Sequence, residues 1–137
     1  MLRWITLFCT LVIFNCHAEL LINDASVRLL PPGVPNTSAY FELVNTGDQP
    51  EIIVSVTTDI ARSVEIHNHV MDGETMYMER QTELTVPPLT SVKFMPGGLH
   101  LMVFGLNQAL TEGQAVRFML TTKAGLILPF DAIVVRP

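Results

Sequence analysis

Residues 64–79 read VEIHNHVMDGETMYME, and this stretch favours a β-hairpin. Val64, Ile66 and Val70 fall on one face of a strand, because successive side chains of a strand point to opposite faces. Asp72-Gly73 is a strong signal for a tight hairpin turn. Residues 75–79 then form the return strand. The stretch therefore predicts β-structure at the centre of the chain.

Short apolar runs separated by turn residues extend this pattern in both directions. We expect further strands near residues 27–29, 38–44, 52–56, 90–95, 99–104, 115–123 and 126–135. Residues 106–110 suit either a short helical turn or a plain loop. Strands at a spacing of roughly 8–12 residues are typical of a sandwich or barrel. The sequence thus predicts an all-β fold, an antiparallel β-sandwich or barrel, and its 137 residues suit a single domain.

The charge pattern argues against a nucleic-acid partner. The formal net charge is -5, only 15% of residues are charged, and no basic run occurs. Nothing is therefore available to neutralise phosphates.

The N-terminus has the pattern of a secretory signal peptide. A basic start at Arg3 precedes an apolar run over residues 4–14, and a small residue, Ala18, marks a cleavage position. The apolar run is shorter than the ~20 residues that a membrane-spanning helix needs. We expect cleavage after Ala18, with residues 19–137 as the mature domain in the periplasm and no stable membrane insertion. An uncleaved anchor, or lipid attachment at Cys16, is the alternative.

This cleavage would remove both cysteines, Cys9 and Cys16. The mature chain would then have no disulfide, no thiolate nucleophile and no thiolate metal ligand. A blue-copper electron-transfer site needs a cysteine thiolate, so that class of copper protein is excluded.

Histidines and methionines cluster between residues 67 and 102. His100 and Met102 share one face of a strand, while Leu101 and Val103 suit the core on the other face. We expect the first pair to point toward solvent. His67 and His69 likewise share a face, and Met76 and Met78 share one on the return strand. If the hairpin lies beside the strand at residues 99–104, imidazoles and thioethers can meet.

These ligand types select the metal. Thioether sulfur is soft and neutral and suits Cu(I), whereas zinc normally takes thiolates or a carboxylate beside its histidines. Some members of the cluster have simpler interpretations. His69 suits a solvated surface residue, Met71 and Met76 suit turn-flanking fillers or auxiliary sulfurs, and Met119 suits packing. From composition and spacing, a metal site and an incidental cluster are equally supported.

The spacing of four of these residues resembles the ligand spacing of a known family. His67, Met78, His100 and Met102 match the pattern H-x10-M-x21-H-x-M of the PCu(A)C periplasmic copper chaperones. The surrounding segments agree, among them 31–33, 39–41, 45–48, 64–67, 71–73 and 96–102. The resemblance covers nearly all of the chain from residue 20 onward.

The resemblance implies a cupredoxin-like Greek-key β-sandwich that binds Cu(I) through His67, Met78, His100 and Met102. From their place in the cluster, His69, Met71 and Met76 are auxiliary candidates. It also implies delivery of copper to the binuclear copper centre of cytochrome c oxidase, alongside a thiol-bearing assembly chaperone. Copper buffering or resistance without a dedicated acceptor is the alternative. A His- and Met-rich C-terminal extension found in some members has no counterpart after Val135, so we expect no second site of that kind.

We expect a monomer without enzymatic activity. A Ser-His-Asp arrangement is the enzymatic alternative, and the nucleophile-elbow motif G-x-S-x-G that would support it is missing from the sequence.

Overall fold

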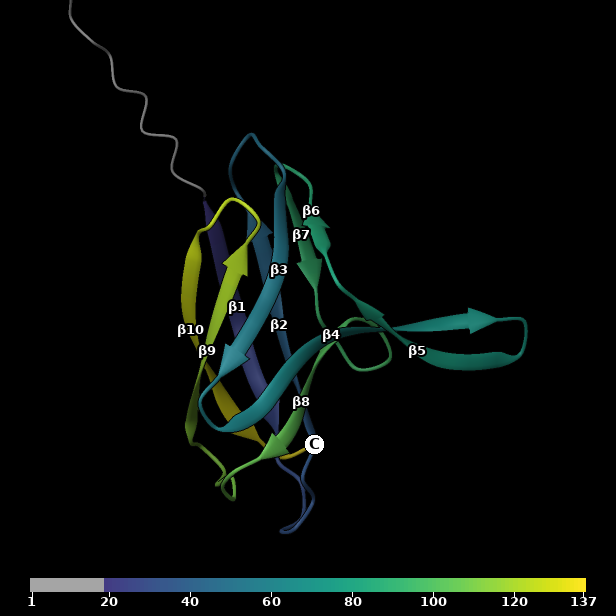
Figure 1. Cartoon of the computed structure of the whole chain (residues 1–137), viewed down its shortest axis with the longest axis vertical. Helices are drawn as coiled ribbons and strands as arrows, with labels where there is room; N and C mark the ends of the chain where they lie inside the picture. The colour runs from purple at the N-terminus through teal and green to yellow at the C-terminus, as the bar shows by residue number, and fades with distance from the viewer. Residues whose placement is uncertain (1–18) are drawn as a thin grey trace, which may run out of the picture.

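The computed structural model describes residues 19–137, which form ten β-strands (Figure 1). The expected signal peptide at residues 1–18, with both cysteines, lies outside the described residues. The strands are β1 Leu20–Arg28, β2 Thr37–Asn45, β3 Glu51–Thr58, β4 Ala61–Asp72, β5 Thr75–Gln81, β6 Leu84–Val86, β7 Thr90–Lys93, β8 His100–Leu106, β9 Ala115–Thr122 and β10 Ile127–Val135.

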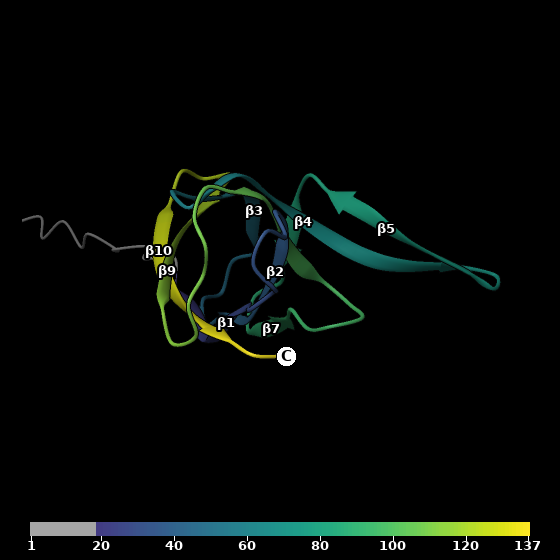
Figure 2. The same cartoon turned by 90° about the horizontal axis from the view of Figure 1, so that it is seen from below.

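The strands form one sheet that wraps around a single core. The order is β5-β4-β8-β2-β1-β10-β9-β3-β6, and β7 pairs with β2. Seen from below, the wrapped sheet encloses the interior like a barrel (Figure 2). The all-β sandwich class predicted from the sequence is therefore confirmed. One pairing differs from an antiparallel arrangement, because β1 and β10 run parallel.

Alternation along each strand builds the core. In β2 every second residue is buried, and in β9 Val116, Phe118 and Leu120 are fully buried. Phe41 stacks on Phe94 with ring centroids 4.2 Å apart. Segments that alternate apolar and polar residues therefore form strands with one face in the core.

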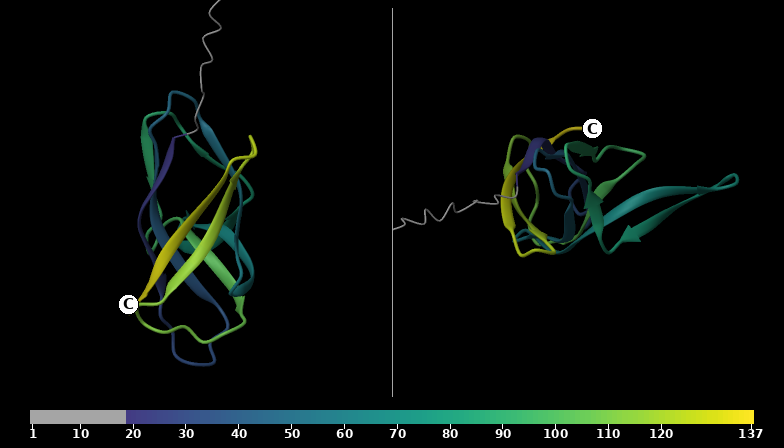
Figure 3. Two further views of the ribbon diagram at one scale, coloured as in Figure 1. Left: turned by 90° about the vertical axis from the view of Figure 1, so that its left-hand side faces the viewer. Right: turned by 90° about the horizontal axis from the view of Figure 1, so that it is seen from above.

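The β4–β5 hairpin departs from the barrel. It extends outward on one side, and the view from above shows the same projection while β9 and β10, in yellow-green and yellow, close another side (Figure 1, and Figure 3, right). The pairing explains this shape, since the β4–β8 ladder ends at His67↔His100 while β4 continues with β5 as far as Asp72↔Thr75. The outer hairpin is thus a two-stranded ribbon.

The turn of this hairpin has the glycine that its geometry requires. Gly73 has φ +61°, whereas φ of Glu74 is not positive. This is the pattern of a two-residue type II′ turn. The sequence-based expectation of a hairpin at Asp72-Gly73 is confirmed. Leu106 ends β8 and residues 107–110 are loop, so no helical turn forms there. Residues 19–137 contain no helix that could cross a membrane.

Candidate metal centre

Three adjacent strands bring the candidate ligands to one face of the sheet. His67 of β4 lies directly opposite His100 of β8, and His69 lies opposite Met78 of β5. Glu65 lies opposite Met102. Directly opposite residues share a face, and so do residues two apart, so all six side chains are on the same side. This is the face away from the core, as the sequence predicted for His100 and Met102.

The expectation that His100 faces solvent is wrong. Its exposed fraction is only 3%. The rings of His67 and His69 lie 5.8 and 5.2 Å from the His100 ring, centroid to centroid, and the residue follows a tight loop over residues 94–99. Neighbouring imidazoles and this loop therefore exclude water from a face that strand alternation alone would leave open.

Hydrogen bonds determine which nitrogen two of these histidines present. His100 Nδ1 lies 3.0 Å from the Gly98 carbonyl oxygen, which can only accept, so Nδ1 carries the proton. His67 Nε2 lies 2.7 Å from Glu65 Oε2 and donates to it in the same way. The opposite nitrogen of each ring, His100 Nε2 and His67 Nδ1, is left with a free lone pair.

These free nitrogens are buried and have no hydrogen-bond partner. His67 Nδ1, His69 Nδ1 and His100 Nε2 are each shielded from solvent without a partner. Buried polar atoms without partners are uncommon and costly, which indicates that something else satisfies them. His69 therefore belongs to the cluster, contrary to its interpretation as a solvated surface residue.

The environment also keeps His100 in the form that binds a metal. Burial lowers the pKa of His100, and the neighbouring His69 and His67 lower it further, while the hydrogen bond to Gly98 opposes the shift. A neutral imidazole is the form that ligates metal ions.

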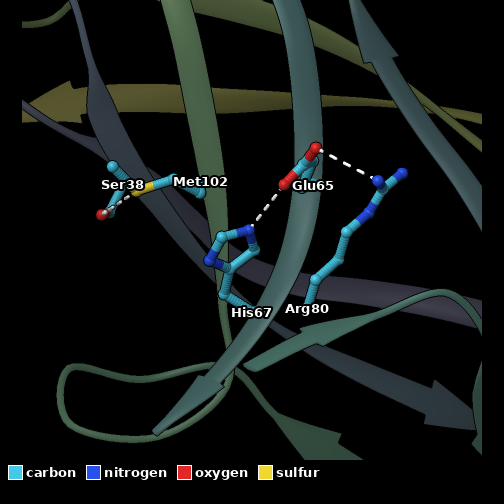
Figure 4. Close-up of polar contacts among 5 residues, drawn as sticks. All are labelled: Ser38, Glu65, His67, Arg80 and Met102. Carbon is cyan, nitrogen blue, oxygen red and sulfur yellow. Dashed lines mark hydrogen bonds and ion pairs between the residues drawn. The ribbon is translucent and has the colours of Figure 1, made fainter. Parts of the chain in front are cut away.

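The methionines differ in how far they are enclosed. Met102 is half-buried, and Ser38 Oγ donates to its sulfur at 3.8 Å (Figure 4). Met78 is 54% exposed and is separated from β8 by the width of β4. Met71 and Met76 are exposed and oppose each other near the hairpin turn. Met119 lies apart from the cluster, on β9, between the buried residues Phe118 and Leu120.

Glu65 is a member of the site that sequence reasoning did not select. Glu65 Oε2 accepts the hydrogen bond from His67, and its other oxygen, Oε1, lies 3.5 Å from Arg80 (Figure 4). A carboxylate on the far nitrogen of a ligating histidine fixes the ring and raises its basicity. The signal was present in the sequence, since a residue two positions before a histidine on a strand shares its face.

The donor set fits a soft monovalent ion better than a hard or divalent one. Among residues 19–137, no three His, Cys, Asp or Glu side chains form a ready group for a metal ion. The face that presents the three imidazoles also presents the thioethers of Met78 and Met102. Neutral imidazole and thioether ligands together suit Cu(I).

Comparison with protein families identifies the chain. The family model described as "Putative lipoprotein LpqE-like" matches residues 20–134. The chain belongs to the LpqE-like family. The same match includes all four residues of the spacing pattern.

Two curated relatives of this LpqE-like protein carry no established function in their names. "Putative lipoprotein Lxx21020" of Leifsonia xyli is 30% identical over 109 residues, which is 79% of this chain. "Uncharacterized protein RP573" of Rickettsia prowazekii is 26% identical over 110 residues, or 72% of this chain. The LpqE-like chain spans only 64% and 61% of the lengths of these relatives.

Solved structures with the same fold are PCuAC domains, which confirms the resemblance found in the sequence. The copper-bound PCuAC domain of PmoF2 is 24% identical, with a TM-score of 0.74, 88% of this chain and 97% of that chain covered. The Cu(I) form of DR1885 from Deinococcus radiodurans is 30% identical, with a TM-score of 0.66, 83% of this chain and 76% of that chain covered.

Proposed function

We propose that this LpqE-like protein binds one Cu(I) ion through His67, Met78, His100 and Met102 and passes it to an acceptor outside the cytoplasm. The observation that supports this most directly is the set of buried ring nitrogens without partners on the same face as two thioethers. A bound ion would satisfy nitrogens that the protein itself leaves unpaired. This role is one of binding and delivery rather than catalysis.

The similarity to DR1885 supports the choice of metal. That protein is 30% identical to this chain and has been solved in a Cu(I) form. Glu65, the carboxylate on the same face as the proposed ligands, is engaged by His67 and Arg80. A site of four neutral donors keeps the charge of a Cu(I) complex low and disfavours divalent ions, which prefer anionic ligands.

Exposure of one ligand supports release by ligand exchange. Met78 is 54% exposed, whereas His100 is buried. An incoming thiolate can replace the exposed thioether first, and thiolates are stronger soft ligands. This chemistry fits a thiol-bearing assembly chaperone or the copper-centre domain of cytochrome c oxidase as the acceptor. The lipoprotein names of the family and of one relative support export, and we place the protein in the periplasm.

X-ray absorption on the Cu(I)-loaded protein tests the ligand set. We expect two nitrogen and two sulfur neighbours around copper. A shell of nitrogen and oxygen alone would contradict the assignment.

A matched set of variants tests the thioethers in solution. Leucine keeps the size of methionine and removes the sulfur, so M78L/M102L should lose Cu(I) affinity by competition with a chelator. M119L removes a sulfur outside the cluster and should bind like the wild type. Transfer to a purified oxidase copper-centre domain then separates delivery from buffering, since a buffer would retain its copper.

A further inference from the structure

Three successive cross-strand pairs continue along the site face of the β4–β5 hairpin. They are His67↔Arg80, His69↔Met78 and Met71↔Met76. Members of one pair lie opposite each other, and each pair is two residues further along both strands than the last. Since side chains two apart share a face, the Met71–Met76 pair lies on the same face as the proposed copper site.

The Met71–Met76 pair, the outermost of the three, is exposed and does not belong to the buried core. Met71 is 58% and Met76 59% exposed, and they pair next to the turn of the β4–β5 hairpin. This hairpin projects from the barrel (Figure 1). Large apolar side chains that are both exposed and paired in this way indicate a binding role rather than a core role.

The geometry of a directly opposite pair suits two-sulfur ligation. The Cβ atoms of such a pair are about 4.5–5.5 Å apart, and methionine is unbranched and flexible. Both sulfurs can therefore reach a single ion from the same side. Neighbouring pairs on one face are about 6.5–7 Å apart along the strand, so the His69–Met78 pair is the next step inward.

The charge of the turn favours a cation at this position. Asp72 and Glu74 flank Gly73, and residues 71–79 contain no lysine or arginine. Two exposed carboxylates raise the local concentration of cations without belonging to the proposed ligands.

We propose that Met71 and Met76 form a second, outer site for a soft monovalent cation, through which Cu(I) enters and leaves the inner site. The relay role rests on the proposed function, whereas the outer site does not. Copper passes from Met71 and Met76 to the His69–Met78 pair and then to His67, His100 and Met102. Each step replaces one copper–ligand bond by another, so no electron moves and the ion stays monovalent.

Titration with Ag(I) tests the outer site. Silver is a soft monovalent ion without redox chemistry here, and methionine methyl groups labelled with ¹³C report each sulfur separately by NMR. We expect the first equivalent to shift the methyls of Met78 and Met102, and a second equivalent to shift those of Met71 and Met76. M71L/M76L should lose the second set of shifts. Methyls of Met71 and Met76 that stay unchanged at two equivalents would overturn the proposal.

Extraction of Cu(I) by a small chelator tests the relay. We expect release from M71L/M76L to be about tenfold slower than from the wild type, because the exit path loses its sulfurs. M119L should release copper at the wild-type rate. A small chelator needs no protein docking surface, and leucine retains the apolar contacts of methionine. If Met71 and Met76 have only a hydrophobic role, M71L/M76L will release copper at the wild-type rate. That result would overturn the relay.

The two proposals fail in different ways. Shifts at Met71 and Met76 without any shift at Met102 would support the outer site and contradict the proposed inner ligand set. Shifts at Met102 with none at Met71 and Met76 would support the inner site and overturn the outer one.

Discussion

At the scale of single residues, hydrogen bonds decide what each histidine presents to a ligand. The Glu65 carboxylate accepts a hydrogen bond from the N–H of His67 Nε2, and the Gly98 carbonyl accepts one from the N–H of His100 Nδ1. One partner is a side chain and the other is backbone, so only the first can be removed by substitution.

The substitution E65A is expected to weaken Cu(I) binding without removing a ligand. His67 loses the group that fixes its ring and tautomer, and loss of such a partner typically costs about 10–100-fold in metal affinity. Competition with a chelator measures the change. Glu79 provides a control with the same charge change, because it pairs with Asn68 and so lies on the other face. Equal Cu(I) affinities of E65A and E79A would contradict this role of Glu65.

The substitution M102L separates binding from stability. Leucine fills nearly the same volume, so the free energy of unfolding of the apo protein should change by less than about 1.5 kcal/mol. The sulfur is lost, and Cu(I) affinity should fall strongly. Denaturant unfolding and chelator competition measure the two quantities. An unfolding free energy that falls while copper affinity is kept would identify Met102 as a packing residue instead.

Residue spacing predicted which side chains share a face, but not how far each is enclosed. The pattern placed His100 and Met102 away from the core, and the register agrees. The 3% exposure of His100 arises from two other rings and the loop at residues 94–99. Such cover depends on contacts between strands and on loop shape, which alternation within one strand does not encode.

At the scale of elements, the hairpin is held by its turn and its ladder rather than by packing.

Short strands are the least visible in sequence, and β6, at Leu84–Val86, was not predicted because three residues show too little alternation. The β4–β5 hairpin was predictable, since Asp72-Gly73 fixes the turn and the alternation is long. Its projection from the barrel was not, because it depends on where the β4–β8 ladder ends.

The substitution G73A is expected to loosen the hairpin locally. Gly73 has φ +61° and no atom lies within 4 Å of an added Cβ, so the effect comes from backbone strain alone. That strain costs roughly 1–2 kcal/mol for an L-residue. Hydrogen exchange of β5 amides should become faster, and Cu(I) binding should weaken as Met78 loses its position.

Gly113 offers a matched control for this change. It has φ +85° and equally open surroundings, but it precedes β9 and is not part of the hairpin. G113A should leave β5 exchange unchanged. The same acceleration in both variants would show that the hairpin responds to global stability and not to its own turn.

At the scale of the whole molecule, the proposed ligands meet only when distant parts of the chain pair. The site requires β8 beside β4 and β5 beside β4, and the same sheet closes around one core. An ion that binds only the folded state must therefore stabilise the entire fold, including regions that do not touch it.

The substitution F118A tests this coupling from a position outside the cluster. Phe118 is fully buried and stacks on Phe130 with centroids 5.4 Å apart, so truncation should cost about 3–5 kcal/mol and lower the melting temperature. Ag(I) at 100 times its dissociation constant should return about 2.7 kcal/mol of this stability. Calorimetry of F118A with and without Ag(I) measures the shift. F118A/M102L, which lacks one proposed inner ligand, should show a smaller rise in melting temperature at that Ag(I) concentration than F118A does. A metal-induced rise of equal size in both variants would mean that the stabilising ion binds elsewhere, because the core defect is the same and only the sulfur differs.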